Sequence, residues 1–327
     1  MRLLTVAILA LAIAAPTLAA APAPLVLESR ILLGHVRGRI DHLAIDVARR
    51  ILYVAELGND SVGVVDLKTG HVVRRLGGLR EPQGIGYVVA TDTLCVANAG
   101  DGSVRLFHGP DLTPVGTINL GDDADNMQVD PRSNRVWVGY GSGALGVIDT
   151  SSRQRLASVA LSGHPESLQF DSSSRRVLVN VPDTREIAVI DVETTTQVAS
   201  WPLRRLRGNF PMAIDVARRE AVVAFRSPPK LGIFGLSTGQ LQSMVDTCED
   251  ADDVFVDSQR HRVYLSCGAG FIDVLAATES GYARVARIST TIGARTALFV
   301  PELDRLFVAV RASGSEPAAV WVYRPEP

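Results

Sequence analysis

The sequence is short of cysteine, of net charge and of long apolar runs, and each shortage excludes a class of protein. Three cysteines in 327 residues are too few for a disulfide-dense scaffold, although an oxidising compartment would allow one bridge. The 33 basic residues nearly balance the 35 acidic ones, so the chain lacks the basic excess that nucleic-acid binding requires. The same balance gives no electrostatic reason to expect an anionic membrane surface as a partner.

One apolar run stands out, and it lies at the N-terminus. It covers residues 3–15 after the basic Arg2, and the small residues 19–21 follow it. A run of this length is shorter than the roughly 20 residues that span a bilayer, but it is typical of a secretory signal peptide. We therefore predict a signal peptide over residues 1–21, a mature chain over residues 22–327, and a periplasmic or secreted location without a membrane span.

Several catalytic and cofactor motifs are also missing. The chain has no GxSxG elbow, no HExxH zinc motif, no GxxxxGK[ST] phosphate loop and no CxxCH haem attachment site. These absences exclude the common nucleophilic, metalloprotease and nucleotide-hydrolysing classes at the level of sequence motifs. They leave binding proteins and less conventional enzymes.

What the sequence does contain is a repeat. An apolar strand ends in a turn with Asp and Arg, and a second apolar strand follows, as in LAIDVARRILYVAE. The alternation and the content of Val, Ile, Leu and Tyr indicate strands. The recurring aspartates at the end of the first strand are expected to form turns with a local ion pair, because an active site is needed only once. The copies begin at Leu43, Gly86, Met127, Leu168, Ala213, Val254 and Leu298.

Seven copies at a spacing of roughly 42 residues match the blade period of a β-propeller. Each copy continues with a third apolar strand, such as LGVIDT from Leu145, and a more variable fourth. Four antiparallel strands per unit make one blade. We therefore predict an all-β fold, a single seven-bladed β-propeller, which explains why so long a chain need not divide into two domains.

The two ends of the chain predict how the ring closes. The last unit has three strands and stops at Pro327, whereas LVLESRILLG from Leu25 precedes the first unit and resembles a fourth strand. We expect this N-terminal strand to complete the C-terminal blade, which removes exposed sheet edges.

The repeat resembles that of the YVTN-repeat β-propellers, a bacterial and archaeal group. The matching residues are Tyr53-Val54-Ala55-Glu56, Val64-Val65-Asp66, Cys95-Val96-Ala97-Asn98, Val147-Ile148-Asp149 and Val189-Ile190-Asp191. The resemblance covers essentially the whole mature chain and implies the propeller fold. It implies no single function, because members include surface-layer proteins, periplasmic binding proteins and enzyme subunits.

In a propeller, the loops that lead into the innermost strands surround one mouth of the central channel, and function lies in loops of this kind. These loops contain Arg39, Asp123, His164, Asp250 and Asp253, among others. The candidate ligand-binding residues in them are Asp41, His42, Gln83, Asp125, Asn126, Glu166, Asp252 and Arg295.

Part of this ring could hold a cation. The candidate metal ligands are Asp41, Asp125, Asn126 and Asp252. Carboxylate and amide oxygens suit calcium or magnesium, and a histidine would shift the preference toward a transition metal. The alternative is that loops at a solvated mouth are polar in any case and use Asp and Asn to make turns. No other cofactor is expected.

Two of the cysteines are placed to meet. Cys248 lies in the loop before the first strand of the sixth unit, and Cys267 ends its second strand. In an antiparallel hairpin these two positions share one edge, so a disulfide is predicted, with free thiols or a redox pair as the alternatives. Cys95 occupies the second-strand position of Tyr53 and Trp137, where a buried, inert thiol is expected.

These observations favour a periplasmic scaffold, expected to be monomeric, that binds a small polar ligand or an unknown periplasmic protein. The alternative is a metal-assisted lactone hydrolase or lyase, implied by a resemblance to gluconolactonase-like propellers, which hold a central divalent ion. The glutamate that this family places early in its first blade has only Asp41 as a counterpart here. A third interpretation, an accessory subunit of a periplasmic redox enzyme, rests on fold and location, which some amine dehydrogenase subunits share.

Overall fold

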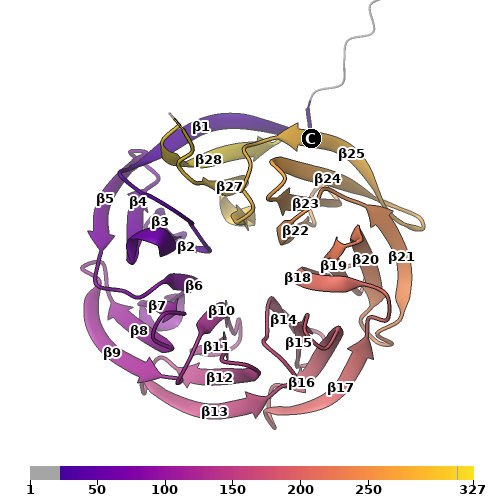
Figure 1. The fold of residues 1–327 in the computed structure, drawn as a ribbon, viewed down its shortest axis with the longest axis horizontal. Coiled ribbons are helices and arrows are strands. Elements are labelled where there is room, and N and C mark those ends of the chain that lie inside the picture. Colours follow the sequence, from indigo (N-terminus) through magenta and orange to yellow (C-terminus); the bar gives the residue numbers. More distant parts are fainter. Residues whose placement is uncertain (1–22, 315) are drawn as a thin grey trace, which may run out of the picture.

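The computed structural model describes residues 23–314 and 316–327. They form a ring of seven antiparallel sheets, each of four strands, around a central channel (Figure 1). The predicted seven-bladed, all-β architecture is confirmed. The predicted signal peptide, residues 1–21, lies outside the described residues.

Blades are numbered along the chain, and in blades 1 to 6 the first strand is innermost and the fourth outermost. Blade 1 contains β2 (Leu43–Asp46), β3 (Ile51–Glu56), β4 (Ser61–Asp66) and β5 (His71–Leu76). Blade 2 contains β6 (Pro82–Val88), β7 (Thr93–Asn98), β8 (Ser103–His108) and β9 (Thr113–Asn119). Blade 3 contains β10 (Ala124–Val129), β11 (Arg135–Tyr140), β12 (Ala144–Asp149) and β13 (Gln154–Ala160).

The second half of the ring repeats this arrangement. Blade 4 contains β14 (Leu168–Asp171), β15 (Arg176–Val181), β16 (Glu186–Asp191) and β17 (Thr196–Pro202). Blade 5 contains β18 (Arg207–Asp215), β19 (Glu220–Ser227), β20 (Pro229–Gly235) and β21 (Leu241–Asp246). Blade 6 contains β22 (Ala251–Asp257), β23 (Arg262–Cys267), β24 (Phe271–Thr278) and β25 (Gly281–Ser289). Blade 7 contains β26 (Ala297–Val300), β27 (Arg305–Val310), β28 (Ala318–Pro325) and, as its outermost strand, β1 (Leu25–Gly34).

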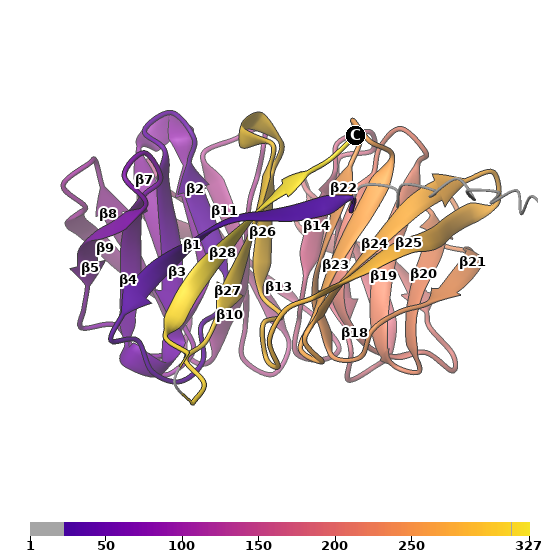
Figure 2. The same ribbon diagram turned by 90° about the horizontal axis from the view of Figure 1, so that it is seen from above.

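The ring closes through β1, as predicted. This strand runs antiparallel to β28 along the outside of blade 7, from the pair Leu25–Pro325 to the pair Gly34–Ala318 (Figure 2). Because β1 pairs the outer edge of β28, the last blade has the same four strands as the others. The N-terminal strand therefore joins the two ends of the chain without any covalent link.

The apolar core is divided among the seven junctions between neighbouring blades. Each of the seven buried clusters combines residues from two adjacent sheets. At three junctions an aromatic residue of a second strand meets one on the innermost strand of the next blade, as in Trp137 and Phe170, whose rings lie 5.9 Å apart edge to face. Cys95 takes this second-strand position in blade 2, where it is a buried free thiol, and burial raises its pKa. A blade therefore buries its faces only when both neighbours are present.

The face opposite the candidate site is built from the recurring turns. Their aspartate side chains accept hydrogen bonds from backbone N–H groups two or three residues further on, as predicted for Asp46, Asp130, Asp171, Asp215 and Asp257. Arg49 pairs with Asp46 and also makes two hydrogen bonds, of 2.8 and 2.7 Å, to Asp92 of the next blade. These polar groups serve the fold, which leaves the other mouth for function.

The only helical segments among residues 23–314 and 316–327 are short 3-10 turns: η1 (Leu57–Asn59), η2 (Val89–Thr91) and η3 (Pro301–Leu303). None of these described segments has the length and hydropathy of a membrane-spanning helix.

Candidate functional site

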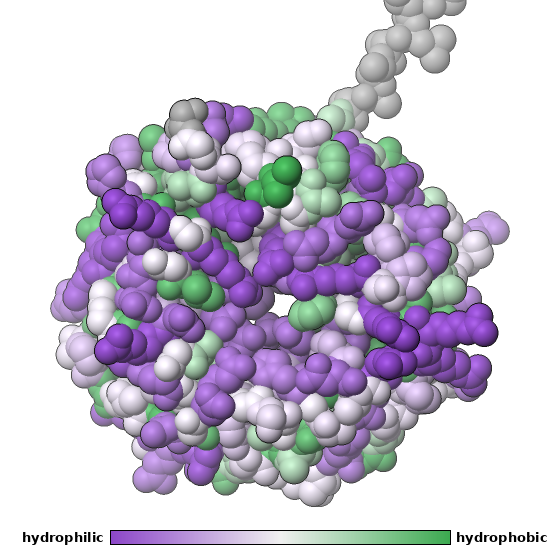
Figure 3. Space-filling view, in the orientation of Figure 1, coloured by the Kyte–Doolittle hydropathy of each residue, from purple (hydrophilic) through white to green (hydrophobic). Residues whose placement is uncertain are grey.

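A polar chamber of about 360 Å³ opens where the innermost strands begin. Hydrophilic residues gather around the central opening on the face shown in Figure 3. Seven of the eight predicted site residues line the chamber: His42, Gln83, Asp125, Asn126, Glu166, Asp252 and Arg295. The loops that the repeat places around one channel mouth therefore do converge on one volume.

Asp41 is the predicted site residue that does not line the chamber. Its side chain is only 1% exposed, and it lies behind His42. Its carboxylate forms an ion pair with Arg39, with 2.8 Å between Nη2 and Oδ2, and lies 3.6 Å from His42 Nε2. Burial raises the pKa of Asp41, although His42 and Arg39 favour its charged form. In this arrangement Asp41 supports His42 from behind.

His42 lies between two carboxylates. Its Nδ1 atom is 4.0 Å from Asp253 Oδ2, on the side opposite Asp41. Burial disfavours the charged imidazole, but Asp41 and Asp253 outweigh it and raise the pKa of His42 to about 9. Burial has the opposite effect on Asp253 and raises its pKa to about 7. The charge of His42 and a 2.7 Å hydrogen bond from the Ala297 backbone N–H lower this pKa, but burial outweighs them. Asp41 and Asp253 therefore favour the cationic form of His42.

Two carboxylates beside blade 6, Asp250 and Asp252, are held by arginines. Asp252 Oδ2 lies 3.1 Å from Arg295 Nε, and Asp252 Oδ1 accepts a short hydrogen bond from Arg226 Nη2. Arg295 also contacts Asp250, with 3.1 Å between Nη1 and Oδ1, and Arg226 stacks over the ring of Phe210. Two arginines thus neutralise two aspartates on this side of the mouth.

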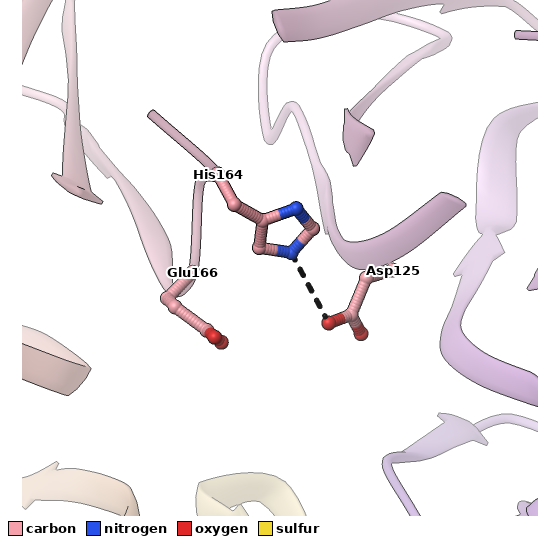
Figure 4. Close-up of side chains that lie close together, drawn as sticks. All are labelled: Asp125, His164 and Glu166. Atoms are coloured by element: carbon pink, nitrogen blue, oxygen red, sulfur yellow. Dashed lines mark ion pairs between the residues drawn. The ribbon is translucent and has the colours of Figure 1, made fainter. Parts of the chain in front are cut away.

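A different group forms where blades 3 and 4 meet. Figure 4 shows Asp125, His164 and Glu166 directed toward one another, and their ligand atoms all lie within 4.8 Å of one another. His164 Nε2 is 3.6 Å from Asp125 Oδ2, and this carboxylate raises the pKa of His164. Burial raises the pKa of Glu166, and the charge of Asp125 adds to that effect.

Neighbouring polar groups orient two members of this group. The Nδ1 atom of His164 lies 2.6 Å from the backbone carbonyl of Gly141, which fixes the ring with Nε2 toward Asp125. The side-chain amide of Asn126 donates a 3.0 Å hydrogen bond to Glu166 Oε2. Asn126 therefore lies in the chamber as predicted and acts on Glu166.

The four candidate metal ligands do not form one coordination group. Asp41 is paired with Arg39, and Asp252 is paired with Arg226 and Arg295. Asp125 is the one carboxylate of the four that lies beside other candidate ligands, and its neighbours are His164 and Glu166.

Sequence reasoning missed Arg226 as a site residue. It follows the apolar stretch of β19, near the end of a second strand, and second strands end at the same edge at which the innermost strands begin. A charged residue at that edge was the sequence feature that could have identified Arg226 as a site residue.

A second cavity of about 370 Å³ continues along the channel and shares His42, Asn126 and Asp253 with the chamber. Its walls carry more apolar side chains, among them Met127 and Phe299. The candidate site is therefore a polar chamber above a less polar channel.

Cys248 and Cys267 lie at the rim beside blade 6. Their sulfur atoms are joined in a disulfide, with 6.0 Å between the Cα atoms. The bridge ties the segment that carries Asp250 to the end of β23, so it braces the arginine side of the mouth.

The chain is similar to solved propeller structures, and the likeness extends over most of its length. One is the hydrazine synthase of Kuenenia stuttgartiensis, with a TM-score of 0.72, 15% identity, and coverage of 86% of this chain and 98% of that chain. Another is a chain in the crystal structure of a mitotic checkpoint complex, with a TM-score of 0.78, 14% identity, and coverage of 97% and 99%. The sequence matches no family model and no curated protein sequence. At these identities the likeness establishes the fold alone.

Proposed function

We propose that the protein is an exported propeller that binds a small polar ligand in the chamber at its channel mouth. The observation that carries this proposal is the chamber itself, a volume of about 360 Å³ lined by carboxylate, imidazole, amide and guanidinium groups. A concave volume of a few hundred Å³ with a few convergent polar groups is typical of a small-molecule site.

The charge distribution narrows the chemistry of the ligand. Asp125 and Glu166 face the chamber without an arginine partner among the described residues, whereas on another wall two carboxylates favour the cationic form of His42. The oxygen atoms of these carboxyl groups accept hydrogen bonds, so a ligand rich in hydroxyl or amino donors suits the wall formed by Asp125 and Glu166. A polyhydroxylated or amino compound with an acidic group directed toward His42 would satisfy both walls.

Export rests on the sequence of residues 1–21 and on a rim disulfide, which persists in oxidising compartments. Within the propellers, we assign the chain to the YVTN-repeat group on the matching strand residues. Mass spectrometry of the protein from the periplasmic fraction tests export, and a mass that still includes residues 1–21 contradicts it.

A metal-assisted lactone hydrolase or lyase is the second candidate. The observation that favours it is the proximity of Asp125, His164 and Glu166, since a divalent ion held there could polarise a lactone carbonyl and activate a water. The engagement of Asp41 and Asp252 by arginines is the reason why this candidate is second.

The test compares the wild type with two tryptophan variants. Gln83→Trp fills the chamber, and Gln197→Trp places the same side chain on the exposed outer strand β17. Thermal unfolding is measured with a panel of amino acids, amines, sugar acids and sugar lactones. A ligand present at a hundred times its dissociation constant should raise the free energy of unfolding of the wild type and of Gln197→Trp by about 2.7 kcal/mol. It should not raise that of Gln83→Trp.

Turnover of a lactone in the same panel would move the conclusion to the hydrolase. Equal stabilisation of all three proteins by every hit would contradict the proposal, because the ligand would then bind outside the chamber. If no compound stabilises the wild type, the chamber is not a site for these classes, and the protein-binding alternative takes its place.

A further inference from the structure

The group formed by Asp125, His164 and Glu166 has the ligand set of a transition-metal site. Two carboxylates and one imidazole supply three ligand atoms of mixed oxygen and nitrogen type. Calcium and magnesium select oxygen ligands alone, whereas zinc and its neighbours accept imidazole together with carboxylate. We propose that these three residues bind one divalent transition-metal ion, with zinc as the leading case. This inference goes beyond the proposed small-ligand site, concerns the ion that the second candidate function would require, and is tested separately from both.

The spacing of two of the ligands already fits. With bonds of about 2.1 Å, two ligands of a tetrahedral ion lie about 3.4 Å apart. The distance from His164 Nε2 to Asp125 Oδ2 is 3.6 Å. The longest separation in the group is 4.8 Å or less, and rotation of side-chain torsions, chiefly in the long Glu166 side chain, can close it.

The surrounding contacts are those that support metal ligands elsewhere. The Gly141 carbonyl, 2.6 Å from His164 Nδ1, takes the hydrogen bond of one ring nitrogen and so leaves Nε2 as the ligand. Asn126 holds one oxygen of Glu166 and leaves the other available. These two contacts come from different segments, the end of β11 and the strand β10, so the orientation does not depend on the three ligands alone.

Among the described residues, His164 is the only basic side chain that pairs with Asp125 or Glu166. The three arginines that line the chamber are bound elsewhere: Arg39 pairs with Asp41, and Arg226 and Arg295 pair with Asp250 and Asp252. A divalent ion would compensate Asp125 and Glu166 in the way that two arginines compensate the aspartates of blade 6. Since the described part of the chain supplies three ligands here and the group faces the chamber, the ion would keep at least one position open to water or to a ligand.

The experiment titrates zinc, and cobalt(II) as a visible probe, into the purified protein after treatment with a chelator. The wild type should bind one ion per chain at this site, with cobalt absorption bands that report nitrogen and oxygen ligation. His164→Gln and Glu166→Gln each remove one ligand and should weaken binding by at least about 10- to 100-fold. Asp253→Asn removes a carboxylate from another wall of the same chamber and should keep the wild-type affinity within a factor of about three, because Asp253 is neither one of the three ligands nor hydrogen-bonded to one.

Calcium should not compete with zinc for this site. The proposal is overturned if the wild type binds less than one ion, if both ligand variants bind zinc as the wild type does, or if calcium displaces zinc at equal concentration. Thermal unfolding without metal checks that each variant is folded. If His164→Gln is unfolded, Glu166→Gln and the cobalt spectrum of the wild type decide the question, since glutamine has nearly the shape of glutamate.

Discussion

The two sides of the channel mouth contain similar numbers of carboxylates, but they treat them differently. Beside blade 6, Asp250 and Asp252 are paired with Arg226 and Arg295. Between blades 3 and 4, no arginine or lysine among the described residues lies within ion-pair distance of Asp125. Compensation by arginine, and not the count of acidic residues, therefore distinguishes the two sides of the mouth.

The largest expected effect on stability comes from removing the disulfide beside blade 6, on the arginine side of the mouth. Replacing both Cys248 and Cys267 with alanine removes a bridge that closes a loop of about 20 residues, which should cost about 3 kcal/mol of unfolding free energy. Denaturant unfolding measures the loss. The affinity for zinc should stay at the wild-type value, since the bridge is remote from Asp125.

Peptide mapping without reduction provides the control for this prediction. Alkylation of Cys248 in the native, unreduced protein would show that the bridge does not form. A double variant as stable as the wild type would show that the bridge forms without bracing the rim.

A smaller effect should follow from removing one arginine of the compensated side. Arg295→Met keeps much of the side-chain volume but leaves Asp250 and Asp252 with Arg226 alone, which should cost about 1–2 kcal/mol because these groups are partly exposed. Thermal or denaturant unfolding measures the change. Arg80→Met is the matched control: Arg80 is exposed, and its replacement should change stability by less than about 0.5 kcal/mol. Equal losses in both variants would mean that the pairing contributes nothing specific.

The smallest expected effect is a pH dependence on the uncompensated side. Burial raises the pKa of Glu166 above its ordinary value of 4.5, so the folded chain holds a proton that the unfolded chain releases. The stabilisation that this proton gives the folded chain is fully present below pH 4.5, and it is lost as the pH rises through the raised pKa of Glu166. Glu166→Gln stays neutral, so with a chelator present it should match the wild type near pH 5 and exceed it by about 1 kcal/mol near pH 9.

Asp252→Asn should change the stability in the direction opposite to Glu166→Gln, which tests the difference between the two sides of the mouth. It removes a charge that two arginines need, and it should be less stable than the wild type at both pH values. Melting curves of the three proteins at pH 5 and pH 9 decide the matter. If Glu166→Gln loses stability on the alkaline side, the carboxyl of Glu166 is compensated after all.

The fold followed from the sequence because each blade repeats its own local pattern. The alternating apolar strands between Asp- and Arg-containing turns predicted the blades, and the missing fourth strand after Ala318–Pro325 predicted the closing role of Leu25–Gly34. Both are statements about strands, which hydrophobic periodicity reports well.

The candidate site followed only in outline. The loops predicted which residues surround the mouth, but pairing across blades depends on side-chain direction and on partners some 40 residues away, as for Asn126 and Glu166. Asp41 and His42 are neighbours in sequence, yet one lies behind the wall and the other lines the chamber. Arg226 reaches the chamber from a second strand and not from one of the loops around the mouth. Sequence alone could not show which carboxylates an arginine would reach.

The closure of blade 7 has a consequence for the order of folding. Leu25 is made long before its partner Pro325, because the six other blades lie between them in the chain. Until then β1 has no strand to pair with, and the contact that completes the ring is among the most distant in the chain. Contacts so distant slow folding more than they change final stability, and an unpaired edge strand is prone to intermolecular association in the meantime. The ring can thus be closed only after all seven blades have been made.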